Sequence, residues 1–434
     1  MPTLLIQLVA TLFSLRFLYS LLFVLLLPVV LLRTWYRGIK SPEYRKRVGE
    51  RLGFYRVAAS KPVIWVHSVS VGETLAAVPL VKRLLADYPN HQLLITTMTP
   101  TGSARVQDLY KEQLGKQVLH VYAPWDLPTA TGRFLKYFKP QLAIVMETEL
   151  WPNWVAQCNV RKIPMLLANA RLSERSAKGY AKVSGLTRPM FAGVDMIAAQ
   201  TEQEVERFKT LGAINTQACG SIKFDHSLSD ELKTTAAELK RQLGDRPIWI
   251  AASTRLGEDE ILLQTHQQLL KQFPNLLMIL VPRHPERFNA VADMIDQVGL
   301  TKVRRSHGQI PTEKDQVWLG DSMGEMNLMF GLVDIAFVGG SLVDTGGHNM
   351  LEPALWGVPV VTGQSCFNFL DISQKLQNCG GLKQVGDGQQ LQQQISQWLT
   401  DVAAKQQAGD AAKAFIEQNR GAIDRVMKLI KHLL

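Results

Sequence analysis

Short apolar runs alternate with helix-like segments from Pro62 onward. In the first half of the chain these runs lie at 63–67, 93–97, 142–146, 165–167 and 196–199. In the second half they lie at 248–252, 276–281, 317–319, 335–338 and 358–361. The spacing between runs leaves room for crossover helices, so each half is predicted to form a parallel sheet covered by helices.

The two halves share a turn motif after their first predicted strand. Residues 68–73 read SVSVGE and residues 253–258 read STRLGE, so both match S-x-x-x-G-E. The recurrence predicts two similar α/β units, joined by the polar stretch 224–244, with closing amphipathic helices at 411–434. In doubly wound sheets ligands bind at the carboxyl ends of the strands, so two such sheets are expected to face a cleft.

The N-terminal segment is apolar enough to anchor the chain in a membrane. From Leu4 to Leu32 the residues are mostly apolar, apart from Arg16, and seven Lys and Arg against two Glu follow between 33 and 51. About 20 apolar residues cross a bilayer, and a basic flank holds the domain after it on the cytoplasmic side. A cleaved signal peptide is disfavoured because the first residues lack Lys and Arg and no small-residue cleavage site follows. The pattern leaves open whether the segment spans the bilayer or lies in one leaflet.

Composition and charge indicate which classes of binding partner the protein has. The formal net charge of +10 favours an anionic membrane or an anionic substrate, whereas nucleic acid is not predicted, because no zinc-finger, basic-zipper or RNP-like pattern occurs. The four cysteines are scattered without metal-ligand spacing, which is typical of unreactive thiols in a reducing compartment. No cofactor and no metal site are predicted.

Most of the ionisable candidates lie just after predicted strands. The stretch 346–353 reads GGHNMLEP and follows the run 335–338. Its glycines allow a ligand to approach the backbone, although Asn349 and Glu352 also fit a helix capping box. The other candidates after strands are Glu73, Glu147, Glu149, Lys223, Arg283 and Glu325. Because helix capping alone does not need so many ionisable groups at the same edge of both sheets, the pattern favours a ligand site.

These residues resemble the Kdo transferases of Gram-negative bacteria, which attach 3-deoxy-manno-octulosonic acid to a lipid A precursor. The resemblance runs from the N-terminal anchor to the last helix. It rests on HSVSVGE (67–73), TMTPTGS (97–103), METELWPN (146–153), NARLS (169–173), GSIKFD (220–225), LVPRHPERF (280–288), MGE (323–325) and GGHNMLEP (346–353).

The resemblance implies a glycosyltransferase B fold, with two Rossmann-like domains facing a cleft. The expected parts are a membrane anchor (1–35), an acceptor-binding domain with a basic juxtamembrane segment (36–228), and a CMP-sugar-binding domain with the closing helices (229–434). The implied reaction transfers Kdo from CMP-Kdo to lipid IVA in lipopolysaccharide core biosynthesis, on the cytoplasmic side of the inner membrane and without a metal. No Asp-x-Asp pair occurs in the chain, consistent with metal-independent transfer.

The resemblance also assigns roles to residues. Glu73 is implied as the general base, and Glu147 and Lys223 as groups that stabilise the transition state. The implied contacts of the donor nucleotide are Pro282, Arg283, Met323, Gly324, Glu325, Asn349, Met350, Leu351 and Glu352.

Each role has a structural alternative. Glu73 also fits a capping box with Ser70, Glu147 fits a cap or pair near Trp151, and Lys223 fits a solvated loop lysine. Arg283 fits an ion pair with Glu286, and His348 fits a polar turn. His67 is interpreted as a hydrogen-bonded core histidine and is left out of the catalytic set. Two other functions remain open: a UDP-sugar transferase of the same fold, and a membrane-anchored protein that binds a nucleotide without turnover.

Overall fold

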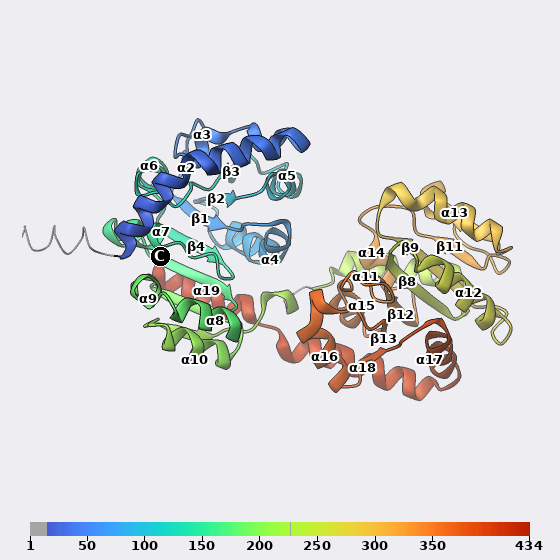
Figure 1. The fold of residues 1–434 in the computed structure, drawn as a ribbon. Coiled ribbons are helices and arrows are strands. Elements are labelled where there is room, and N and C mark those ends of the chain that lie inside the picture. Colours follow the sequence, from blue (N-terminus) through green and yellow to red (C-terminus); the bar gives the residue numbers. More distant parts are fainter. Residues whose placement is uncertain (1–14, 226) are drawn as a thin grey trace, which may run out of the picture. The chain divides into compact units, whose positions relative to one another are not determined.

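The computed structural model describes residues 15–225 and 227–434, which form two compact units (Figure 1). Of the described residues, the N-terminal unit comprises 15–225 and 420–434, and the C-terminal unit comprises 227–419. The N-terminal part of the predicted anchor, residues 1–14, lies outside the described residues. The predicted join was too long, because 230–243 forms a helix that begins at the Ser229 cap.

The N-terminal unit is a seven-stranded parallel sheet in the order β3-β2-β1-β4-β5-β6-β7. Its strands are β1 (Val63–His67), β2 (Gln92–Thr97), β3 (Val118–Tyr122), β4 (Leu142–Met146), β5 (Met165–Ala170), β6 (Met196–Ala199) and β7 (Thr216–Ala218). Its helices are α2 (Leu15–Lys40), η1 (Pro42–Arg45), α3 (Val48–Arg51), α4 (Val71–Asp87), α5 (Pro100–Leu109), α6 (Pro128–Phe138), α7 (Pro152–Val160), α8 (Glu174–Ala181), α9 (Ser184–Ala192), α10 (Glu202–Thr210), η2 (Ile222–Phe224) and α19 (Ala422–Leu433).

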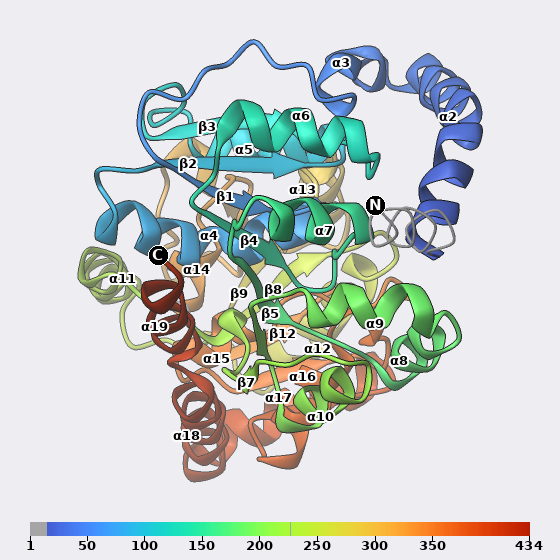
Figure 2. The ribbon, with the colours of Figure 1, turned by 90° about the vertical axis from the view of Figure 1, so that its left-hand side faces the viewer.

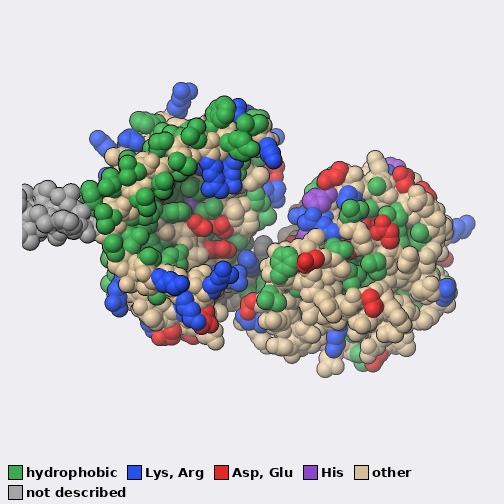
Figure 3. Space-filling view, viewed as in Figure 1, with side chains coloured by type: hydrophobic (Ala, Val, Ile, Leu, Met, Phe, Trp, Pro, Cys, Tyr) green, Lys and Arg blue, Asp and Glu red, His purple; other side chains and the backbone are tan. Residues whose placement is uncertain are grey.

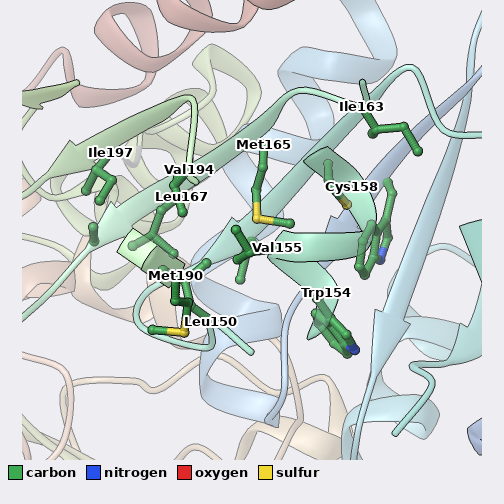
Figure 4. Close-up of a cluster of buried hydrophobic side chains, with 14 of the residues drawn as sticks. Leu150, Trp154, Val155, Cys158, Ile163, Met165, Leu167, Met190, Val194 and Ile197 are labelled. Atoms are coloured by element: carbon green, nitrogen blue, oxygen red, sulfur yellow. The ribbon is translucent and has the colours of Figure 1, made fainter. Parts of the chain in front are cut away.

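Alternate residues of each strand point to opposite faces of this sheet, and both faces are buried because helices cover them. Trp65 of β1 packs on one face with side chains of α6, α7, α9 and α10. The close-up of part of this cluster shows Trp154 and Val155 of α7 and Met190 of α9 (Figure 4). Ile64 and Val66 pack on the other face with α4, α5 and α19. The closing helix α19 therefore belongs to the N-terminal unit, although the sequence analysis assigned it to the C-terminal domain. Its apolar side, which includes Ile423 and Val426, completes a face of the first sheet.

The C-terminal unit repeats the architecture with the order β10-β11-β9-β8-β12-β13-β14. Its strands are β8 (Ile248–Thr254), β9 (Leu277–Pro282), β10 (Lys302–Arg304), β11 (Val317–Leu319), β12 (Ile335–Val338), β13 (Val360–Thr362) and β14 (Leu382–Gln384). Its helices are α11 (Asp230–Leu243), α12 (Asp259–Leu270), η3 (Pro285–Arg287), α13 (Phe288–Gln297), η4 (Arg305–His307), α14 (Met326–Phe330), α15 (Leu351–Leu355), η5 (Phe367–Phe369), α16 (Leu370–Asn378), α17 (Gly388–Thr400) and α18 (Val402–Asn419). Helices α12, α13 and α17 cover one face, and α11 and α14 cover the other. The prediction of two parallel α/β sheets is confirmed.

Helix α2 lies along the surface of the N-terminal unit and contacts α7 and α9 (Figures 1 and 2). Its partly buried positions recur every three or four residues, for example at Phe23, Leu27 and Val30, so only one stripe of the helix faces the protein. Near its start, the Ser20 hydroxyl bonds the Asn153 amide (3.0 Å); near its end, Arg45 Nε donates to the Trp35 carbonyl (3.1 Å). The helix is therefore held to the unit near both ends.

Candidate functional site

The carboxyl edge of the first sheet gathers three carboxylates. Glu73 lies in the first turn of α4, after β1, and Glu147 and Glu149 follow β4, the strand paired with β1. Burial raises the pKa of Glu149 to about 6, and the negative charges of Glu73 and Glu147 add to the shift. Burial is also the main cause that raises the pKa of Glu73, with a contribution from Glu147. The structure thus brings the predicted pair Glu73 and Glu147 together, with Glu149 beside them.

Glu73 is held in a specific pose. The Val69 N–H donates to its Oε2 (2.8 Å) and the Ser70 hydroxyl donates to its Oε1 (2.8 Å). The Ser70 Oγ also caps α4 by accepting from the Glu73 N–H (3.4 Å). Ser70 therefore caps the helix, as the capping interpretation requires, while the Glu73 carboxylate accepts from the Val69 N–H and the Ser70 hydroxyl. A carboxylate has about four acceptor positions, so two of them remain for a substrate proton.

Glu147 sits in a strained turn. Its φ is +56°, a left-handed conformation that residues with a Cβ rarely adopt, and its N–H donates to the Ala168 carbonyl (2.9 Å). Such conformations persist where the surroundings enforce them and are frequent at functional sites.

Lys223 lies on η2, which packs against α4, the helix that carries Glu73. The position of η2 is fixed by Asn169 at the end of β5, whose Oδ1 accepts from the Ile222 N–H (3.2 Å). Asn169 has a φ of +53° and is 1% exposed, and its Nδ2 has no partner within the described residues. The sequence analysis gave Asn169 no role, although NARLS was one of the motifs quoted.

His67 is a core residue, as interpreted from the sequence. It is fully buried, its Nδ1 bonds the Thr96 hydroxyl (2.8 Å), and burial lowers its pKa to about 3. The imidazole is therefore neutral at physiological pH and packs edge-on against Trp154, with 4.7 Å between ring centroids.

The carboxyl edge of the second sheet gathers cations instead. Arg255, after β8, donates from Nε to His348 Nε2 (3.1 Å) and from Nη1 to His284 Nε2. Both imidazoles therefore accept from one guanidinium. Burial lowers the pKa of His348 to about 4, and the charges of Arg255 and Arg283 contribute. The imidazole of His348 is neutral, whereas Arg255 and Arg283 supply positive charge.

Arg283 follows β9, and its N–H donates to the Thr254 carbonyl (3.0 Å). No ion pair joins it to Glu286 within residues 227–434; it is His284 that lies 3.9 Å from Glu286. The alternative in which Arg283 pairs with Glu286 is therefore wrong. Sequence reasoning missed Arg255 and His284, and it set His348 aside as a turn residue, because their pairing depends on contacts distant in the chain.

The GGHNMLEP stretch adopts a different local structure from the predicted capping box. Helix α15 begins at Leu351, after Met350, and spans five residues. Asn349 Oδ1 accepts from the Leu351 N–H (3.1 Å), while Asn349 Nδ2 donates to Glu352 Oε1 (3.0 Å). Burial raises the pKa of Glu352, although Asn349 and Arg283 lower it. The carboxylate of Glu352 is thus held by a side-chain amide and not by the backbone of the helix start.

The remaining predicted contacts lie on neighbouring loops of the same unit. Glu325 receives three hydrogen bonds from Arg305, the shortest being 2.6 Å, and one from Ser322. The bond with Arg305 is the main cause that lowers the pKa of Glu325. Gly324 has a φ of +86° and open space at the position of a Cβ. Pro282 ends β9, and Met323 is 63% exposed in the loop before Glu325.

Comparison with known proteins decides the family. Residues 46–226 match the family described as 3-Deoxy-D-manno-octulosonic-acid transferase (kdotransferase). The chain is 45% identical over 425 residues to the 3-deoxy-D-manno-octulosonic acid transferase of Haemophilus influenzae, covering 96% of this chain and 99% of the relative. The chain belongs to the Kdo transferase family. The resemblance drawn from the motifs is thereby confirmed.

Two solved structures are also similar. The C-terminal CMP-Kdo binding domain of WaaA from Acinetobacter baumannii is 35% identical, with a TM-score of 0.42, and the match covers 44% of this chain and all of that one. The UDP-GlcNAc 2-epimerase of Neisseria meningitidis has a TM-score of 0.56 at 14% identity, covering 85% of this chain and 100% of the epimerase. The second match shows that this Kdo transferase shares the two-sheet fold of that enzyme. This match gives no information about the substrate.

Proposed function

We propose that this Kdo transferase moves Kdo from CMP-Kdo to a lipid A precursor, lipid IVA, with Glu73 as the general base. The proposal rests on the environment of the Glu73 carboxylate. Glu73 is a buried carboxylate of raised pKa, fixed by two hydrogen bonds and with acceptor capacity to spare. A sugar hydroxyl is a poor nucleophile, so a positioned base must take its proton as the bond to the anomeric carbon forms. A raised pKa makes the ionised carboxylate a stronger base than an ordinary glutamate.

Glu147 and Lys223 have supporting roles in this proposal. Glu147 carries a negative charge that raises the pKa of Glu73. A negative carboxylate near the reacting carbon also favours the positive charge that develops on a sugar ring during transfer. The ammonium of Lys223, on the element packed against α4, would counter the negative charges of the sugar acid and of the leaving group.

The donor nucleotide is assigned to the C-terminal unit and the acceptor to the N-terminal unit. The leaving group is a nucleoside monophosphate, whose charge Arg255 and Arg283 are suited to balance. His284 and His348 hold the Arg255 guanidinium in place. Because α15 has only five residues, these arginines contribute more to phosphate binding than the helix dipole does. Since the guanidinium groups of Arg255 and Arg283 supply the positive charge, we propose that transfer needs no metal.

The other donor contacts follow from the loops around this cation cluster. Glu352, held by Asn349, is proposed to accept hydrogen bonds from the ribose hydroxyls, as acidic residues do in other nucleotide sites. The backbones of Met350 and Leu351 would lie beside it. Pro282, Met323, Gly324 and Glu325 are proposed to enclose the base and sugar of the nucleotide.

We also propose that the protein works on the cytoplasmic face of an inner membrane, held by its N-terminal segment. Within residues 15–225 and 227–434, α2 is one helix long and apolar enough to cross a membrane, with a mean hydropathy of 2.5 over its best window. No residue of that window is fully buried, and the apolar side chains on the side of α2 away from the protein are free for lipid.

One assay tests the proposal. The purified protein is incubated with CMP-Kdo and lipid IVA, and the products are identified by mass spectrometry. We expect Kdo-lipid IVA and CMP, in the presence of EDTA as well as without it. A protein that binds CMP but forms no product would support the non-catalytic alternative. CMP is expected to raise the melting temperature and UDP is not; stabilisation by UDP alone would favour the UDP-sugar alternative.

A further inference from the structure

A pocket of the N-terminal unit has no role in the proposed reaction. It encloses about 280 Å³ and is lined by α2, η1, the end of α3 and the loops that follow β2 and β3. Three arginines line it, Arg33, Arg37 and Arg51, and none of its lining residues is acidic. The combination of a concave site and several guanidinium groups without a carboxylate is typical of a site for a phosphate group.

The environment of Arg51 is the strongest indication of an anionic ligand. Arg51 is 4% exposed, and one of its nitrogens donates to the Met98 carbonyl (2.9 Å), while its guanidinium carbon lies 4.3 Å from the centre of the Tyr122 ring. Its Nε has no partner within the described residues. The neighbouring carboxylate of Glu50 bonds Arg47 (2.8 Å) and the Tyr122 N–H (2.7 Å) instead. A buried guanidinium without a carboxylate bonded to it is costly, and a bound phosphate would offset that cost.

Arg33 and Arg37 add two cations from one face of α2. They are four residues apart, so their side chains project from the same side of the helix. Both are exposed, and Arg37 lies over the ring of Tyr44 at 5.6 Å. Within the part of the chain that the structure describes, neither forms an ion pair with an acidic residue. Their charges are therefore free to meet a ligand.

Part of the pocket lining belongs to the TMTPTGS motif (97–103), which has no role in the proposed reaction. Thr99 lines the pocket and caps the ten-residue helix α5, accepting from the Gly102 N–H (3.1 Å). The positive end of the α5 dipole thus adds to the three arginines. The Thr99 hydroxyl also contacts the Val69 carbonyl (3.4 Å), and the Val69 N–H holds Glu73. The pocket is therefore connected to the proposed base through a single residue.

The surroundings of the pocket indicate that its ligand has an apolar part. Val30, Met98 and Trp125 line it together with the cations. The outer side of α2 is apolar and open to solvent; Leu25 and Leu32 are each 67% exposed, and Val29 is 58% exposed. Hydrophobic side chains gather over α2 in the space-filling view (Figure 3). Such a face is suited to contact lipid, which would bring the basic end of α2 and the pocket near the lipid phosphates.

We propose that this pocket binds the phosphate group of a membrane lipid, with the acyl part of that lipid against α2. The site goes beyond the proposed function, because phosphate binding here needs neither CMP-Kdo nor transfer. The lipid is either a phospholipid of the bilayer or the phosphorylated acceptor itself; the chemistry of recognition is the same. In both cases the bound phosphate bridges α2, the end of α3 and the loop after β2.

The test measures binding of a dispersed lipid to the full chain in a neutral detergent. The probe is dioctanoyl phosphatidic acid, titrated by calorimetry, with inorganic phosphate as a second probe. The variant is Arg33→Gln/Arg37→Gln, whose exposed positions leave the fold intact. The matched control is Arg16→Gln/Lys40→Gln, which removes two positive charges from the same helix outside the pocket. Melting curves of both variants verify folding.

We expect the pocket variant to bind phosphatidic acid about 30-fold more weakly, the effect expected when two cations that face a lipid phosphate are lost. The control variant should bind like the unmodified protein. Equal losses in both variants would overturn the proposal, since surface charge would then explain the binding. Inorganic phosphate that binds as tightly as the lipid would overturn it as well. Competition with lipid IVA then identifies the source: displacement assigns the pocket to the acceptor, and its absence assigns it to a phospholipid, and both results support a lipid phosphate.

Discussion

Replacing Glu73 by glutamine separates its two possible roles, and the structure sets the size of each effect. The carboxylate accepts from the Val69 N–H and from the Ser70 hydroxyl, both at 2.8 Å. Glutamine retains one acceptor oxygen, so its amide group faces one of these two donors. An unsatisfied buried donor costs about 1–3 kcal/mol, and a domain is stable by about 5–15 kcal/mol. The Glu73→Gln protein is therefore expected to fold and to melt at a somewhat lower temperature.

The effect on the reaction is expected to be far larger. Glutamine cannot accept a proton, and a general base contributes about 10²–10⁴ in rate. The assay follows CMP release and Kdo-lipid IVA formation, together with calorimetry of CMP binding. We expect CMP to bind the variant normally, because Glu73 lies in the N-terminal unit and the proposed CMP contacts lie in the C-terminal unit.

Glu204 offers a matched control in the same unit. It forms a true capping box with Thr201 at the start of α10, and its carboxylate accepts from the Thr201 N–H (3.0 Å) and the Leu172 N–H (3.2 Å). Glu204→Gln makes the same chemical change at a buried cap, so it is expected to lower the melting temperature similarly and to keep transfer within a few-fold. If Glu73→Gln also retained transfer within a few-fold, Glu73 would be a structural cap and the base assignment would be refuted.

Three further predictions concern charge and the anchor. Because the base acts in its ionised form, transfer should fall as the pH drops through the raised pKa of Glu73. Glu147→Gln removes a negative neighbour and so lowers the pKa of Glu73, which should shift the acidic limb of the pH–rate profile to lower pH. An unshifted limb would contradict the coupling between the two carboxylates. Glu352→Gln should weaken CMP binding by about 1–3 kcal/mol in calorimetry, while the exposed Glu286→Gln should not; equal affinities would return Glu352 to a structural role. A protein without residues 1–32 should leave the membrane fraction and still transfer to a dispersed acceptor, and a folded but inactive product would contradict an anchor without a chemical role.

The sequence predicted the inner strands of both sheets and missed four edge strands, β3, β7, β10 and β14. Inner strands are buried on both faces and read as continuous apolar runs, such as Val63–His67. Three of the missed strands have only three residues and are polar: β7 reads TQA, β10 reads KVR and β14 reads LKQ. A strand that is partly exposed and three residues long has no periodicity to detect. The fourth, β3, reads VLHVY and is buried throughout, so it was missed although its pattern is like that of β1.

For the candidate site, too, the sequence predicted some features and not others. Position after a strand is a local property, so the sequence placed Glu73, Glu147 and Arg283 at the correct edges. The partners of these groups are not local. Arg255 meets His348 across 93 residues of chain, and only the pairing of β8 with β12 brings their loops together. For the same reason the pocket beneath α2, built from segments around residues 33, 51 and 99, could not be predicted from any single motif.

The repeated S-x-x-x-G-E motif shows why position alone does not assign chemistry. Glu258 occupies in the second unit the place that Glu73 occupies in the first, and it is fully buried. Its two oxygens accept four backbone N–H groups, from Arg255, Gly340, Ser341 and Leu342, at 2.7–3.0 Å. All of its acceptor positions are therefore engaged, and its role is to hold the loop after β12 against α12. The carboxylate of Glu73 accepts instead from one backbone N–H, that of Val69, and from the Ser70 hydroxyl, and it has two acidic neighbours. The same turn thus yields a structural clamp where the backbone saturates the carboxylate, and a candidate base where it leaves half of the carboxylate open.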